Sequence, residues 1–198
     1  MSALDELAHS RDTDEEEAEK WRKIVGERPN DAHAYAEFAK ASARIGDFDA
    51  AAEAANHALQ LDATLSLPYF VLGSIHAENQ RFAEAEFWFQ KALLLDPYSA
   101  AIHHQLGKVH FQQQEYSEAV NHLEQAVALA PQVSDLHANL ASTYLRIGRF
   151  GDAARESFTI LRRNPLDGSA YRILGWLPFA AFAQSKMPIR IVLVLVLF

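Results

Sequence analysis

The hydrophobic and polar positions of this chain repeat with a fixed period. Apolar residues recur three and four positions apart, which is the spacing of one buried face of an α-helix. Prolines stand at Pro97, Pro131 and Pro165, and the step from the first to the second equals the step from the second to the third. Counting back by the same step reaches Ala63 and then Pro29. The pattern therefore predicts one helical repeat that recurs along most of the chain.

Residues that occupy the same place in successive repeats, here called a column, share one size or polarity. An aromatic or imidazole column is followed three residues later by a bulky apolar column, which predicts the buried face of a first helix. The next column holds only Gly or Ala, so a second helix can approach closely there. The three columns are Tyr35, Tyr69, His103, His137 and Tyr171; Phe38, Leu72, Leu106, Leu140 and Leu174; and Ala39, Gly73, Gly107, Ala141 and Gly175.

A second helix follows the first after a very short turn, so each repeat is predicted to be a helical hairpin. Proline ends the repeat because it lacks an N–H and has a fixed φ, and both properties interrupt a helix. The first helices are expected to end near Gly46, Gln80, Gln114 and Gly148; the second begin with Phe48, Phe82, Tyr116 and Phe150 and turn Ala51, Ala85, Ala119 and Ala153 toward the first.

This arrangement resembles the tetratricopeptide repeat (TPR), a unit of about 34 residues in which an aromatic, a Leu-Gly pair, Ala, an aromatic and Ala precede a terminal Pro. The resemblance covers residues 32–167 and the first helix that follows. It implies an all-α fold, a right-handed superhelical solenoid of antiparallel helix hairpins. The sequence departs from this pattern at four positions. Ala63 stands in place of proline, His103 and His137 stand in place of the large aromatic, and Arg163 stands in place of leucine.

The period also predicts how the chain is divided. Residues 1–13 show no sustained period and are expected to be a flexible acidic leader before an N-terminal helix over 14–28. Beyond the repeats, the columns of a fifth second helix are absent. Four repeats are predicted at 32–65, 66–99, 100–133 and 134–167, then a fifth first helix over 168–177 and an apolar tail over 178–198.

Composition narrows the classes of function. The chain has 198 residues, 49% of them hydrophobic, which is enough for a core. It has 26 acidic against 18 basic residues and a net charge of −8. Because nucleic-acid binding requires clustered Lys and Arg, this composition argues against a nucleic-acid partner. It has no cysteine, which excludes disulfides and thiolate catalysis. With an acidic N-terminal segment that lacks the pattern of a signal peptide, a cytoplasmic location is expected.

The nine histidines raise the question of a metal site. His103 and His137 stand in the aromatic column, and His76 and His110 share the column of Tyr144. All four are therefore predicted to be packing residues with a satisfied ring nitrogen. No carboxylate joins them at ligand spacing, so neither a metal nor a cofactor is expected.

Catalytic motifs are missing from the sequence. It contains no glycine-rich phosphate loop, nucleophile elbow or HExxH arrangement, and we expect a protein that is not an enzyme. The alternative is the regulatory or substrate-docking arm of an enzyme whose catalytic domain is absent from this chain.

The resemblance implies a binding surface, because in TPR proteins the first helices line a concave face along which a peptide or helix of a partner lies. The predicted groove mixes apolar anchors, cations and amides, which fits a protein segment with an acidic group; the alternative is a solvated face that binds nothing. Phe70 fills the middle of the groove, so the carboxylate clamp of chaperone-binding relatives is incomplete. The predicted groove residues are Lys40, Phe70, Ser74, His104, Gln105, Lys108, Phe111, Asn139, Ser142, Leu145, Arg146, Arg172 and Trp176.

A secondary surface is predicted at Phe87 and Trp88, whose columns in the other repeats hold mostly polar or small residues. Exposed paired aromatics are typical of an interface. The alternative is that Trp88 fills the space left by the small Ala54 of the neighbouring repeat.

The last part of the sequence holds two apolar blocks, Ile173 to Ala183 and Ile191 to Phe198, both shorter than the ~20 residues that span a bilayer. Three interpretations stay open: a cap folded onto the last repeat, an interfacial anchor with Lys186 and Arg190 on anionic headgroups, or a membrane segment cut short. The basic flank favours membrane contact through the run from Ile191 to Phe198, at the inner face of a membrane. The sequence leaves homo-oligomerisation open.

Overall fold

The computed structural model describes the chain from residue 3 to residue 177, with side chains from residue 12. Within these residues every regular element is an α-helix and no strand occurs, so the all-α prediction is confirmed. The helices are α1 (Ala3–Glu27), α2 (Ala32–Arg44), α3 (Phe48–Leu61), α4 (Ser66–Glu78), α5 (Phe82–Leu95), α6 (Ala100–Gln112), α7 (Tyr116–Leu129), α8 (Ser134–Arg146), α9 (Phe150–Arg163) and α10 (Gly168–Gly175).

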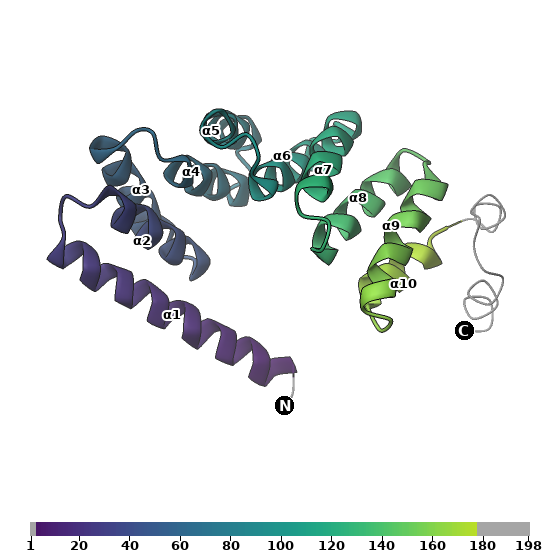
Figure 1. Cartoon of the computed structure of the whole chain (residues 1–198), viewed down its shortest axis with the longest axis horizontal. Coiled ribbons are helices and arrows are strands. Elements are labelled where there is room, and N and C mark those ends of the chain that lie inside the picture. Colours follow the sequence, from purple (N-terminus) through teal and green to yellow (C-terminus); the bar gives the residue numbers. More distant parts are fainter. Residues whose placement is uncertain (1–2, 178–198) are drawn as a thin grey trace. The chain divides into compact units, whose positions relative to one another are not determined.

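The helices fall into two compact units, divided between Tyr98 and Ser99. In the first compact unit α2 pairs with α3 and α4 with α5, and α1 packs on α2 (Figure 1). In the second, α6 pairs with α7 and α8 with α9, and α10 packs on α9 and α8. The predicted helical hairpins are therefore confirmed.

Three helices begin at an aspartate that caps them. The carboxylate of Asp31 accepts a hydrogen bond from the backbone N–H of Ala34 at 3.0 Å, and that of Asp47 from Ala50 at 3.1 Å. Asp167 caps α10 in the same way. Such caps satisfy N–H groups of the first turn that have no partner inside the helix.

One residue in the turn of each hairpin has a left-handed backbone conformation. The φ angles are +83° at Gly46, +57° at Gln80, +64° at Gln114 and +73° at Gly148. These are the four positions near which the first helices were predicted to end. Glycine adopts this conformation without a steric cost, whereas glutamine carries a Cβ that disfavours it.

The two helices of a hairpin cross at the small column. A Cβ added at Gly107 would lie 2.6 Å from Cγ of Leu123 on α7, and one added at Gly73 would lie 2.7 Å from the ring of Phe89 on α5. Both distances are shorter than van der Waals contact. The missing side chains therefore let α6 approach α7, and α4 approach α5, as the sequence predicted.

The bulky column forms the buried face of the first helices. Leu72, Leu106 and Leu140 are 5%, 1% and 2% exposed, which confirms the prediction for these three. In the first compact unit Leu72 packs in a cluster with Ala39, Ala51, Ala54, Ala55, Val71 and Ile75. In the second, Leu140 packs in a cluster with Val120, Leu123, Ala141, Tyr144, Ala153, Ala154, Ile173, Leu174 and Leu177.

The N-terminal helix is longer than predicted. α1 begins at Ala3 instead of near residue 14, so most of the segment expected to be a flexible leader is helical. No proline or glycine precedes Gly26, and nothing in the sequence therefore stops the helix from extending backward. Arg44 at the end of α2 forms ion pairs with Asp14 and Glu17 of α1.

The predictions for the tail, including membrane contact at residues 191–198, fall outside the described residues. Among the helices that are described, none is both long and apolar enough to cross a membrane.

Candidate partner-binding site

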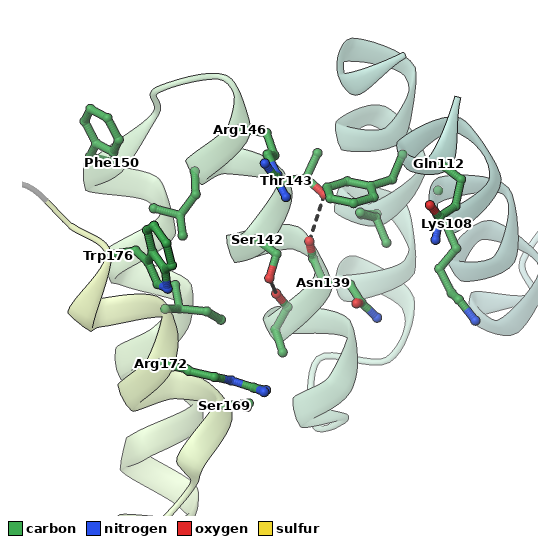
Figure 2. A pocket seen from close by; sticks show the side chains of 16 residues that line it. Lys108, Gln112, Asn139, Ser142, Thr143, Arg146, Phe150, Ser169, Arg172 and Trp176 are labelled. Carbon is green, nitrogen blue, oxygen red and sulfur yellow. Dashed lines mark hydrogen bonds between the residues drawn. The ribbon is translucent and has the colours of Figure 1, made fainter. Parts of the chain in front are cut away.

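The second compact unit contains a cavity of about 640 Å³, lined mainly by the first helices α6, α8 and α10 (Figure 2). Eight of the thirteen predicted groove residues line it: Lys108, Phe111, Asn139, Ser142, Leu145, Arg146, Arg172 and Trp176. The structure thus brings together in one cavity most of the predicted groove residues that lie on these three helices; His104 and Gln105 of α6 are the exceptions.

The predicted groove residues of the first compact unit make local contacts. Lys40 forms an ion pair with Glu37 one turn earlier on α2. The ring centroid of Phe70 lies 5.7 Å from that of Phe89, and the hydroxyl of Ser74 donates to the carbonyl oxygen of Phe70 at 2.9 Å. The charge of Lys40 is therefore already balanced by a neighbour.

Three cations line the cavity of the second compact unit, and no carboxylate does. Arg172 extends from α10 toward α8, and Lys108 stands on α6 (Figure 2). The guanidinium of Arg146 lies 6.0 Å from the ring centroid of Phe111. None of the three forms an ion pair with another described side chain. The side chains that line this cavity therefore carry three positive charges and no negative one.

The polar side chains between these cations are oriented by internal hydrogen bonds. Asn139 Nδ2 donates to His104 Nε2 at 2.6 Å, which uses one of the hydrogen-bonding positions of the amide. The hydroxyl of Ser142 donates to the carbonyl of Ala138 and that of Thr143 to the carbonyl of Asn139, each at 2.8 Å. Because both hydroxyls donate their hydrogen bond to the backbone, they are not available as donors to a ligand. The donors left in the lining include the amide of Asn139 and the three cations.

His104 and Gln105 were predicted to belong to the groove but do not line the cavity. His104 instead accepts a hydrogen bond from Asn139, which does line the cavity. Burial is the largest cause that lowers the pKa of His104; the charge of Lys108 lowers it further, and that of Asp135 opposes the shift. A neutral His104 agrees with its role as acceptor from Asn139.

Large apolar side chains complete the lining. Trp176 is 80% exposed and points into the space between α10 and α8 (Figure 2). Phe111 is half-buried and meets the ring of Tyr116 edge-on at 5.5 Å. Leu145 adds aliphatic surface beside them. Exposed aromatics beside cations are the residue types that dominate protein interfaces.

Seven lining residues were missed by the sequence prediction: Gly107, Gln112, Leu123, Thr143, Phe150, Ser169 and Ile173. Two of them follow from helical spacing, because Gln112 lies one turn after Lys108 and Ser169 one turn before Arg172. Phe150 comes from a second helix, α9, and was assigned only to the start of that helix.

The two residues of the predicted secondary surface, Phe87 and Trp88, differ in their exposure. Phe87 is 51% exposed, with the ammonium of Lys91 5.6 Å from its ring centroid. Trp88 is half-buried: its ring lies 6.0 Å from that of Tyr69 and 6.4 Å from that of His76, and it packs on the cluster that contains Ala54. These contacts support the alternative that Trp88 is a packing residue.

Three of the four histidines predicted to pack are buried with a ring nitrogen hydrogen-bonded: His103 to His122 at 3.1 Å, His110 to Glu115 at 2.8 Å, and His137 to Glu156 at 2.6 Å. His76 differs, because its Nδ1 is buried without a hydrogen-bond partner among the described residues. No group of three or more His, Asp or Glu side chains in the described part of the chain has the arrangement of a metal site.

Comparison with protein families gives three matches. Three models, each described as tetratricopeptide repeat, match residues 32–65, 63–132 and 110–177. Together they span every repeat that the period of the sequence predicts. No curated protein matches this chain.

Solved structures of similar fold are numerous. YrrB, described as a TPR protein with an unusual peptide-binding site, has a TM-score of 0.68 at 22% identity, over 84% of this chain and 84% of that chain. A thermophilic TPR protein from Thermus thermophilus has a TM-score of 0.71 at 21% identity, over 87% and 95%. PilF from Pseudomonas aeruginosa has a TM-score of 0.70 at 19% identity, over 87% and 78%.

Proposed function

Because the chain belongs to the tetratricopeptide repeat family, we propose that it is a non-enzymatic scaffold that binds an anionic segment of a partner protein in the cavity of its second compact unit. The TPR fold is generally a protein–protein interaction scaffold. The proposal adds the location of the site and the charge of the segment that it takes.

The observation that carries the proposal is the charge of the lining. The whole chain has a net charge of −8, yet this cavity is lined by Lys108, Arg146 and Arg172 and by no carboxylate. Carboxylates of a partner segment are the complement to such a lining, since Arg and Lys donate charge-assisted hydrogen bonds to them.

The size and apolar lining of the cavity indicate what surrounds the acidic group. A volume of about 640 Å³ lies in the usual range of ligand sites and accommodates a few residues of extended chain. Trp176 and Phe111 add apolar surface to the lining that carries these cations. We therefore expect an extended segment that combines acidic residues with an apolar side chain. YrrB, which is similar in fold, is described as having a peptide-binding site.

Binding of acidic peptides by the full chain tests the proposal. The probes are fluorescent peptides that combine Asp or Glu with one Phe or Leu, alongside the same peptides with Asn and Gln in place of the acids. We expect the acidic peptides to bind preferentially. Lys108→Glu together with Arg172→Glu should weaken this binding by at least about tenfold, because two favourable charges become repulsive.

A matched control is Arg162→Glu together with Arg163→Glu, which makes the same change of charge at exposed residues of α9 that do not line the cavity. Loss of binding in the cavity variant alone supports the site. If both variants lose binding equally, or if neither loses it, the site is contradicted and the surface at Phe87 becomes the next candidate.

The alternative function is a docking arm of an enzyme. A pull-down that recovers a partner only together with a catalytic activity would favour this alternative.

A further inference from the structure

His104 and Asn139 join two helices of the cavity through one short hydrogen bond. Nδ2 of Asn139 on α8 lies 2.6 Å from Nε2 of His104 on α6. Asn139 lines the cavity and His104 does not. In the view of Figure 2, Asn139 lies between Lys108 of α6 and Arg172 of α10. A change in His104 therefore acts on the lining through Asn139.

The hydrogen-bonding capacity of Asn139 depends on whether His104 is protonated. An asparagine amide has N–H donors on its nitrogen and acceptor positions on its oxygen. When Nε2 of His104 is unprotonated it accepts from Nδ2, so the amide keeps its second N–H and the whole of Oδ1 for a ligand. When Nε2 is protonated it becomes a donor, and the amide must turn over so that Oδ1 accepts from it. Both N–H groups of Asn139 are then left for a ligand.

We propose that His104 is a positioning residue, whose protonation turns the amide of Asn139 into a donor and thereby couples proton uptake to the binding of an acidic segment. The inference rests on the proposed function, because it concerns the same cavity and the same class of partner. A carboxylate only accepts hydrogen bonds, so it pairs with the N–H groups of the amide and is repelled by Oδ1. The cavity therefore binds an acidic segment more tightly when His104 is protonated.

Charged groups on α6 and α8 act on the protonation of His104. Burial is the largest cause that lowers the pKa of His104, and the charge of Lys108 on α6 lowers it further. Asp135 on α8 opposes this shift and raises the pKa. On α7, which also packs on α6, the titratable ring of His122 stacks on that of His110. A carboxylate bound in the cavity acts in the same direction as Asp135, so binding favours uptake of a proton by His104.

The charge of a protonated His104 could also attract the ligand directly, without any part played by Asn139. The two mechanisms make different demands on the amide. Direct attraction needs only the imidazolium, so the pH dependence of binding would survive removal of the amide. The positioning role needs the amide, because His104 does not line the cavity and acts on the ligand through the group that it orients.

Binding of an acidic peptide by the full chain at several pH values tests the proposal. The probe is an N-acetylated peptide that combines Asp or Glu with one Phe or Leu, and isothermal titration calorimetry measures its affinity and proton uptake. Between about pH 7.5 and about pH 5.5 the carboxylates of the peptide stay almost fully ionised. We expect the affinity to rise by about three- to tenfold as the pH falls over this range, which corresponds to about one hydrogen bond. We also expect the complex to take up protons from the buffer.

Two substitutions should abolish this rise in affinity, and one control should keep it. His104→Gln removes the titrating ring, and Asn139→Ala removes the amide that the ring orients. His33→Gln is the matched control, because His33 is exposed on α2 in the first compact unit. A rise that persists in His104→Gln would overturn the role of His104. A rise that persists in Asn139→Ala would show that His104 acts by its charge alone, and would overturn the positioning role.

Failure of this inference differs from failure of the proposed function. If acidic peptides bind, and Lys108→Glu together with Arg172→Glu weakens them, but the affinity does not change with pH, only the positioning role of His104 is wrong. If acidic peptides do not bind the unaltered chain at any pH in the range, the proposed function is wrong and this inference is wrong with it.

A second measurement needs no ligand. NMR follows the side-chain amide resonances of Asn139 and the ring resonances of His104 as the pH falls, while circular dichroism monitors that the chain stays folded. The amide of Asn139 should shift with the same midpoint as the ring of His104, and this shift should be lost in His104→Gln. Amide resonances that do not follow the titration of His104 in the folded chain would contradict the proposal.

Discussion

Asn139 donates a hydrogen bond from Nδ2 to Nε2 of His104 over 2.6 Å, and this bond joins α8 to α6 beside the cavity. Nε2 must be deprotonated to accept it, so His104 is neutral in this arrangement. The lowered pKa of His104, caused first by burial and next by Lys108, agrees with this state. The positive charge of the cavity therefore comes from lysine and arginine and persists at neutral pH.

Changing Asn139→Asp should raise the pKa of His104, because a carboxylate beside Nε2 favours the protonated imidazole. The same change places a negative charge in the cavity and should weaken binding of acidic peptides. Titration of His104 by NMR measures the first effect and peptide affinity the second. Asn139→Ala removes the hydrogen bond without adding charge, and its smaller shift is the reference; equal shifts in both variants would show that the carboxylate does not contact His104.

Stability should fall in acid because of His122, which belongs to the second compact unit. Burial, followed by the charges of His110 and His103, lowers the pKa of His122 from 6.5 to about 4. As the pH falls below about 6.5 the unfolded chain binds this proton before the folded chain does, so the free energy of unfolding decreases down to about pH 4. Above about 6.5 both forms are neutral and this contribution is constant.

His122→Gln removes this titration and should flatten the dependence of the melting temperature on pH between about 4 and 6.5. His33→Gln is the matched control, since His33 is exposed on α2. If the two variants retain the same slope as the unaltered chain, other groups cause the loss of stability in acid.

The hairpins were predictable from the sequence because each column encodes a steric requirement. Gly107 is small because Leu123 lies where its Cβ would be, and Gly73 meets Phe89 in the same way one repeat earlier. Local signals that stop a helix are equally readable, as at Gly148. The start of α1 was not predictable in the same way, because no breaking residue marks where it begins.

The cavity was predictable only in part, since helical spacing shows which face a residue occupies but not which way its side chain turns. His104 lies on the predicted face, yet it is engaged with Asn139 and does not line the cavity. Phe150 lines the cavity from a second helix, a contribution that depends on how α9 packs beside α8. Such contacts follow from tertiary packing and have no periodic signal.

The left-handed turn positions provide a stability test with an internal control. Gln114 has a φ of +64° and Gly148 a φ of +73° in equivalent turns of the second compact unit. Gln114→Gly relieves the contact of its Cβ with the backbone and should stabilise the fold by up to about 1 kcal/mol. Gly148→Gln should destabilise it by a similar amount. Denaturant unfolding measures both; shifts of the same sign would show that the backbone conformation does not determine the outcome.

The close crossing of α6 and α7 predicts a cost for adding a single methyl group. In Gly107→Ala the new Cβ lies 2.6 Å from Cγ of Leu123 and 3.3 Å from the backbone oxygen of Ala119, so the helices must separate or Leu123 must leave its position. Overpacking of this kind costs about 1–3 kcal/mol, which exceeds the gain in helix propensity of about 1 kcal/mol. The same substitution at Gly151 of α9 meets no described atom within 4 Å and should stabilise the protein. Opposite shifts of the two urea midpoints would confirm that the periodic small residues reflect contact between helices, whereas stabilisation by both would show that this contact is loose.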